Sequence, residues 1–145
     1  MNKLLVIDDG EVDLYIIDKL LKRNNVFPDH IMISDSEAAI NLLEQHVDNS
    51  ELLPDVILLD WIMPCLNGFQ FLERFKKIFP AFKKNIEIFV MTCSVYLKDK
   101  KAAEKYPFVK AVLIKPLTSD QLVRMYLNHN ARLAIKNIPV ANAPF

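Results

Sequence analysis

Three carboxylates in this sequence stand where they could bind a divalent metal ion. Asp8 and Asp9 follow the apolar run Leu4–Ile7, and Asp60 follows the apolar run Val56–Leu59. A carboxylate among apolar neighbours is costly unless it is paired or bound to a metal. Adjacent acids also repel one another, and Mg²⁺, which prefers carboxylates, carbonyls and water as ligands, removes that repulsion. The three acids therefore predict a magnesium site.

A lysine and a threonine end two further apolar runs. Lys115 would usually be solvated at such a position, but beside an acidic cluster it is a candidate partner for phosphate. The hydroxyl of Thr92 could satisfy a local carbonyl or donate one hydrogen bond to an anion. The acids have alternatives too, because Asp9 could cap a helix and Asp60 could be a cap or turn residue. Charge favours the metal site, since three carboxylates, one Mg²⁺ and one lysine balance.

Short apolar runs alternate with segments of helical spacing along the whole chain. The runs are Leu4–Ile7, Ile31–Ile33, Val56–Leu59, Ile88–Met91 and Ala111–Ile114. Such runs are typical of strands covered on both faces, while Val12, Ile16 and Leu20 show the helical step of four. Capping boxes at Ser34–Glu37 and Thr118–Gln121 mark two helix starts. The alternation predicts an α/β fold, a doubly wound five-stranded parallel sheet with helices on both faces.

This fold would bring the candidate metal-binding and phosphate-binding residues together. In an open parallel sheet, functional residues lie beyond the carboxyl ends of the strands. The residues that follow or end the predicted strands are Asp8, Asp9, Asp60, Thr92 and Lys115. We therefore expect three carboxylates, one hydroxyl and one ammonium group at a single edge of the sheet.

Composition excludes several other classes of protein. A length of 145 residues predicts one domain, and 18 basic against 18 acidic residues disfavour a nucleic-acid partner. Only Gly10 and Gly68 are glycines, which excludes glycine-rich dinucleotide and phosphate-binding loops. Cys65 and Cys93 are too few for a disulfide framework, and no apolar segment approaches the roughly 20 residues that cross a bilayer. We expect a reduced, cytoplasmic protein with no membrane partner.

The motifs together resemble those of response-regulator receiver domains of two-component systems. They are Leu-Leu-Val-Ile-Asp8-Asp9, Asp-Val-Ile-Leu-Leu-Asp60-Trp-Ile-Met63-Pro64 with Asn67-Gly68, Val-Met-Thr92-Cys-Ser94, and Leu-Ile-Lys115-Pro116. They occur in the order and at the spacing of the family, and the resemblance covers about residues 3–132. It implies a flavodoxin-like fold similar to that of single-domain chemotaxis regulators.

The resemblance also implies a role for each residue. Asp60 would accept a phosphoryl group from phosphohistidine as an acyl phosphate, Lys115 would pair with a phosphoryl oxygen, and the Thr92 hydroxyl would move toward the group after transfer. The Mg²⁺ ligands would be Asp8, mainly through water, and Asp9, Asp60 and the backbone carbonyl of Ile62. The positioning and charge neutralisation that phosphoryl transfer requires would thus come from a metal and a lysine.

These implications describe a stand-alone response regulator. Residues 1–135 would form the receiver domain and residues 136–145 a C-terminal tail, with no DNA-binding domain attached. Its phosphodonor would be a sensor histidine kinase or a histidine phosphotransfer protein, and its output an unknown protein target. It would not be an enzyme beyond self-phosphorylation and slow self-dephosphorylation.

The sequence departs from the family pattern at three positions. Val112 stands where many members carry Tyr or Phe, and Cys93, which we expect to be packed, stands where a smaller residue is usual. Ile62 places an aliphatic group where an amide or charge can orient an attacking water, which predicts a long-lived acyl phosphate. The three histidines lack motif spacing and are expected at the surface: His30, His46 and His129.

Two other functions compete with this interpretation. A phosphohydrolase of the haloacid dehalogenase type also uses an aspartate nucleophile and Mg²⁺, but it needs a second Asp two residues later, where this chain has Ile62. A flavodoxin-like cofactor binder needs a first loop that cradles phosphate, and Asp8 and Asp9 would repel that anion.

Overall fold

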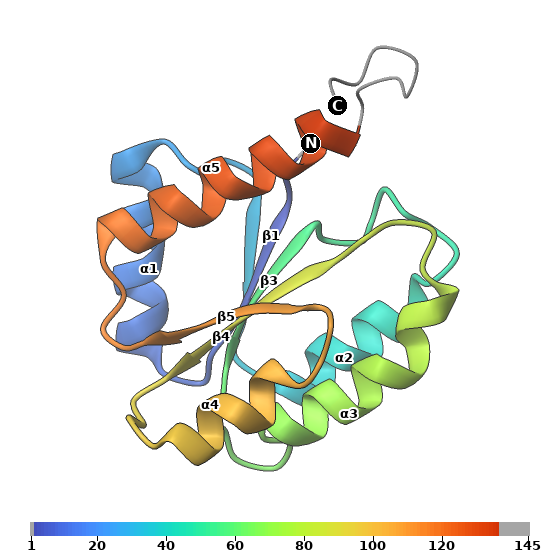
Figure 1. Cartoon of the computed structure of the whole chain (residues 1–145), viewed down its shortest axis with the longest axis horizontal. Helices are drawn as coiled ribbons and strands as arrows, with labels where there is room; N and C mark the ends of the chain where they lie inside the picture. Colours follow the sequence, from blue (N-terminus) through green and yellow to red (C-terminus); the bar gives the residue numbers. More distant parts are fainter. Residues whose placement is uncertain (1, 137–145) are drawn as a thin grey trace, which may run out of the picture.

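A five-stranded parallel sheet forms the centre of the molecule in the computed structural model, which describes residues 2–136 (Figure 1). The strand order is β2-β1-β3-β4-β5. The strands are β1 (Leu4–Ile7), β2 (His30–Ile33), β3 (Val56–Asp60), β4 (Glu87–Thr92) and β5 (Val109–Ile114). All neighbouring strands pair in parallel, as the alternating sequence pattern predicts.

Within residues 2–136, five helices cover the two faces of the sheet. They are α1 (Glu11–Asn24), α2 (Ser36–Gln45), α3 (Gly68–Ile78), α4 (Leu97–Glu104) and α5 (Ser119–Lys136). A short 3₁₀ turn, η1 (Phe79–Ala81), follows α3. Helices α1 and α5 lie together on one face, and α2, α3 and α4 lie on the other (Figure 1). The predicted doubly wound α/β fold is confirmed.

The apolar runs are continuous because both faces of the inner strands are buried. Alternate residues of β1 and β3 enter two separate core clusters, one beneath each layer of helices. Every residue of β3 is buried. Strand β2 differs, because it is an edge strand and Ile31 is 47% exposed. The sequence pattern alone does not distinguish this edge strand from the buried ones.

The predicted helix starts have mixed outcomes. The capping box at the start of α5 is confirmed, since the amide of Gln121 donates to Thr118 Oγ1 (3.2 Å) and the amide of Thr118 donates to Gln121 Oε1 (3.0 Å). The box expected at Ser34 is wrong. Asp35 caps α2 instead, because its carboxylate accepts hydrogen bonds from the backbone amides of Glu37 and Ala38.

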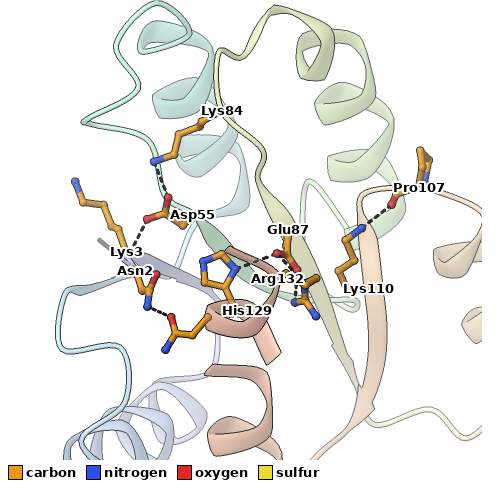
Figure 2. Close-up of polar contacts among 10 residues, drawn as sticks. Asn2, Lys3, Asp55, Lys84, Glu87, Pro107, Lys110, His129 and Arg132 are labelled. Carbon is orange, nitrogen blue, oxygen red and sulfur yellow. Dashed lines mark hydrogen bonds and ion pairs between the residues drawn. The ribbon is translucent and has the colours of Figure 1, made fainter. Parts of the chain in front are cut away.

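An ionic cluster around the buried Glu87 and His129 lies at the amino end of the sheet, as Figure 2 shows. Nδ1 of His129, on α5, donates to Oε1 of Glu87, the first residue of β4, over 2.9 Å. Arg132, one turn further along α5, also pairs with the Glu87 carboxylate. The expectation that His129 lies at the surface is wrong, because this side chain is only 3% exposed. The cluster attaches α5 to the sheet at the end opposite the predicted site.

The chain ends fall partly outside this description. Residues 137–145, which make up nearly all of the predicted tail 136–145, lie outside the described residues. Among the described helices, none has both the length and the apolar character that a membrane span needs.

Candidate functional site

Four parallel strands end at the same edge of the sheet, and each carries a predicted residue there. Asp8 directly follows β1, Asp60 is the last residue of β3, Thr92 is the last residue of β4, and Lys115 directly follows β5. The strands are nearly in register, with Asp60 opposite Met91 and Thr92 opposite Ile114. Strand pairing therefore brings these side chains together, as predicted.

The three predicted acids form one cluster. Each of Asp8, Asp9 and Asp60 offers a carboxylate oxygen within 4.8 Å of the others. Asp8 and Asp60 are buried, whereas Asp9 is exposed. The alternative that Asp9 caps α1 is excluded, because the N-cap residue is Gly10. A set of carboxylate oxygens with one side open to water fits the preference of Mg²⁺ for oxygen ligands and retained waters.

Lys115 reaches into this cluster from the end of β5. Its Nζ lies 2.7 Å from Asp8 Oδ2 and 3.5 Å from Asp60 Oδ2. The backbone amide of Lys115 donates to the carbonyl of Thr92 (2.8 Å), which fixes the start of the loop. The Lys115–Pro116 peptide is cis. Lys115 is therefore an ion-paired side chain and not a solvated one.

Sequence reasoning missed a fourth acid, which lies outside the three-acid cluster but contacts Lys115. Asp13, in the first turn of α1, places Oδ2 3.1 Å from Lys115 Nζ. Its acidity and its closeness to Asp8 in the sequence were the only available signals. The docking of α1 against the loop after β5 brings Asp13 and Lys115 together, and no local pattern predicts that docking.

Burial and charge shift the protonation of the site. Burial, and then the charge of Asp8, raise the pKa of Asp60 to about 7, although Lys115 opposes the shift. Burial lowers the pKa of Lys115, but hydrogen bonding to Asp8 and the charge of Asp60 outweigh it and raise that pKa above its ordinary value. Lys115 therefore stays cationic, and a divalent cation would compete with a proton for Asp60 near neutral pH.

Thr92 is linked to helix α4 by a chain of hydrogen bonds. Its Oγ1 accepts the amide of Ser94 (2.9 Å), so its local partner is an amide and not the carbonyl that the sequence suggested. The Ser94 hydroxyl then donates to Asp99 Oδ2 (2.7 Å) in the first turn of α4. The sequence did not predict this link. It provides a physical path from the end of β4 to α4.

The three departures from the family pattern have clear places in the structure. Ile62 is 62% exposed, and its amide lies 3.3 Å from Asp60 Oδ1. Val112 packs at the border of the core, while the nearby Tyr106 is buried with its hydroxyl bonded to Glu73 of α3. The expectation that Cys93 is packed is wrong, because the thiol lies exposed in the loop after β4.

Comparisons with known proteins agree with this geometry. A family model described as "Response regulator receiver domain" matches residues 4–127. The phosphate regulon transcriptional regulatory protein PhoB of Escherichia coli is 26% identical over 142 residues, which cover 86% of this chain and 58% of PhoB. The chain thus spans less than two thirds of the length of this curated relative.

Solved structures show the same architecture. A response regulator receiver protein from Dyadobacter fermentans is 30% identical, with a TM-score of 0.71 over 88% of this chain and 98% of the other. A two-component response regulator from Cytophaga hutchinsonii has a TM-score of 0.80 over 90% of this chain and 98% of the other. The Cytophaga protein is 24% identical, so this likeness shows the fold alone.

Proposed function

The chain belongs to the response regulator receiver domain family, and we propose that its Asp60 accepts a phosphoryl group from a phosphohistidine donor. One observation carries the proposal. Asp60 is a nearly buried carboxylate that lies beside two further acids and 3.5 Å from a buried ammonium group. Phosphoryl transfer depends mainly on positioning and on neutralising the oxygens of the moving group. The residues around Asp60 are of the kinds that supply both.

The transfer step follows from the chemistry of the donor. A carboxylate oxygen of Asp60 forms a bond to phosphorus while the bond from phosphorus to the donor imidazole nitrogen breaks. The bonding pair stays on that nitrogen, which then takes up a proton, and Asp60 becomes an acyl phosphate. Lys115 pairs with a phosphoryl oxygen, and the Thr92 hydroxyl donates to another.

A magnesium ion fits the acidic cluster by the chemistry of its donors. We propose that Asp8, Asp9, Asp60 and the backbone carbonyl of Ile62 hold it, with Asp8 acting mainly through water. When bound, the ion would neutralise charge on the carboxylates and on the phosphoryl oxygens. The ammonium group of Lys115 and the hydroxyl group of Thr92 are oriented by the protein and not by the ion.

The wider role that we propose is that of a phosphorylated receiver domain acting in the cytoplasm. Residues 1–135 would act as the receiver domain, phosphorylated by a sensor histidine kinase or a histidine phosphotransfer protein. The PhoB relative is a transcriptional regulatory protein by name. For this chain the balanced charge favours a protein target over nucleic acid. A phosphohydrolase is disfavoured, because Ile62 cannot act as the required second acid.

Formation of the acyl phosphate can be tested directly. Incubation with Mg²⁺ and acetyl phosphate should add one phosphoryl group to the chain, detected by intact mass spectrometry. The Asp60→Asn variant should show no adduct, because the amide is a much weaker nucleophile than the carboxylate. An unmodified wild type, or an equal adduct on the variant, would remove the proposal.

The lifetime of the acyl phosphate should depend on Ile62. Its exposed aliphatic side chain cannot orient a water molecule, whereas an amide can. We expect Ile62→Asn to accelerate hydrolysis about tenfold, which corresponds to about 1.4 kcal/mol of activation free energy. Ile62→Leu is the matched control and should decay like the wild type. A phosphate-release time course gives both rates, and equal or slower decay in Ile62→Asn would contradict the hypothesis.

A further inference from the structure

Asp13 lies outside the three-acid cluster yet contacts the lysine of the site. We propose that Asp13 is a positioning residue that holds the Lys115 ammonium group on the α1 side. It thereby weakens the interaction between Lys115 and a phosphoryl group on Asp60. The inference rests on the proposed phosphoacceptor function, and it adds a residue to which neither the family resemblance nor the comparisons give a role.

The Lys115 ammonium group lies at unequal distances from three acids. Lys115 Nζ lies 2.7 Å from Asp8 and 3.1 Å from Asp13, both of which are hydrogen-bond distances. Its distance to Asp60 is longer, at 3.5 Å. An ammonium group has three N–H donors, so two of them point toward Asp8 and Asp13. The lysine is thus held more closely on the α1 side than at the phosphoacceptor.

Because Lys115 is buried, the loss of either close acidic partner has a large effect on its ammonium group. The Lys115 side chain is only 9% exposed, so water can do little to replace a lost partner. Asp13 is 44% exposed and keeps part of its hydration. A new phosphoryl group at Asp60 must compete with Asp13 for the same three N–H donors. Breaking the contact between Lys115 and Asp13 therefore offsets part of the free energy gained when the lysine pairs with the phosphoryl group.

The backbone around Gly10 leaves room for this contact. A Cβ at position 10 would lie 2.9 Å from Asp13 Oδ2 and 3.3 Å from Asp8 Oδ1. The φ angle of Gly10 is −84°, which any residue adopts, so the absence of a side chain matters for space and not for backbone conformation. Gly10 therefore lets the Asp13 carboxylate approach the lysine past Asp8.

Charge points in the same direction. Three acids, one Mg²⁺ and Lys115 would balance, but the carboxylate of Asp13 leaves one uncompensated negative charge. A phosphoryl group adds further negative charge at Asp60. Removal of the Asp13 charge should thus favour the phosphorylated state, because it lowers the negative charge beside the phosphoryl group and frees an N–H donor of Lys115.

The test measures how tightly a phosphoryl mimic binds. Beryllium fluoride is titrated by calorimetry, in saturating Mg²⁺, into the wild type, Asp13→Asn and Glu11→Gln. Glu11 is the matched control, because it lies in the same helical turn, carries the same charge and is exposed, without an ion pair to any described residue. We expect Asp13→Asn to bind about fivefold tighter than both.

The direction of the effect separates positioning from structural damage. A variant that merely disturbed the fold would bind the mimic more weakly, whereas tighter binding by Asp13→Asn alone supports the inference. Equal binding by wild type and Asp13→Asn, weaker binding by Asp13→Asn, or the same gain in Glu11→Gln would overturn it. No binding to the wild type would instead remove the proposed function, and this inference with it.

Discussion

Lys115→Ala should lower the rate at which acetyl phosphate phosphorylates Asp60 by about 10²–10³-fold, the cost of losing one preorganised charge-stabilising group. The reason lies in the surroundings of the ammonium group, which is almost fully buried and lies within 3.5 Å of Asp8, Asp13 and Asp60. Without it, no lysine or arginine among residues 2–136 forms an ion pair with Asp8 or Asp60, so the negative charge of the phosphoryl oxygens loses this counter-ion.

The measurement is the initial rate of adduct formation by intact mass, at fixed Mg²⁺ and donor concentrations. Lys110→Ala is the matched control, because Lys110 lies on the same strand but is exposed and bonds only to the carbonyl of Pro107 among the described residues. The control should react at the wild-type rate. A Lys115→Ala variant that stays folded and reacts within threefold of the wild type would show that the lysine is not part of the transfer.

A second effect separates the lysine from the metal. In Lys115→Ala the buried Asp8 and Asp60 lose their common cation, and because Lys115 lowers the pKa of Asp60, Asp60 should hold a proton more tightly without Mg²⁺. Added Mg²⁺ should therefore recover thermal stability in this variant, but not the rate of phosphorylation. Recovery of both by Mg²⁺ would mean that the ion alone supplies the charge that we assign to Lys115.

The sequence predicts most of the site because strand ends are local features. Each of Asp8, Asp60, Thr92 and Lys115 adjoins an apolar run, and parallel pairing necessarily places such ends at one edge. Asp13 was missed because its contact depends on how α1 docks against the loop after β5. That docking is set by side-chain packing between distant segments, and no residue spacing encodes it.

His129 was wrongly placed for a related reason. Its neighbours in the sequence give no motif, but its partner Glu87 carries a usable signal, as an acid within the otherwise apolar Ile86–Met91. A carboxylate at the start of a buried strand requires a cationic or hydrogen-bonding partner. The sequence therefore implies that a partner exists, although only the fold identifies it as α5.

Glu87→Gln should destabilise the protein by about 3 kcal/mol at pH 7, near the lower end of the cost of breaking a buried ion pair. The Glu87 carboxylate is 3% exposed and accepts hydrogen bonds from His129 and Arg132. An amide in its place leaves the Arg132 charge without a counter-ion and offers only one oxygen to two donors. Urea unfolding monitored by far-UV circular dichroism measures the change.

Glu104→Gln provides the control. Glu104 forms an exposed pair with Lys100 at 3.8 Å, and loss of such a pair costs less than about 1 kcal/mol. Because Glu87 lies at the opposite end of the sheet from Asp60, Glu87→Gln should also keep the wild-type affinity for beryllium fluoride once folded. A loss of stability no larger than that of Glu104→Gln would contradict the role of the cluster.

The pH dependence follows from the direction of the Glu87 shift. Burial raises the pKa of this carboxyl group, but the hydrogen bonds from His129 and Arg132 outweigh burial and lower that pKa from 4.5 to about 2. Because the folded state holds the proton less tightly than the unfolded state, the stabilisation is complete above pH 4.5 and is lost as the pH falls toward 2. The difference in unfolding free energy between wild type and Glu87→Gln should therefore shrink across this interval. A constant difference from pH 7 to pH 3 would mean that Glu87 acts by packing alone, and that α5 is not attached to the sheet through charge.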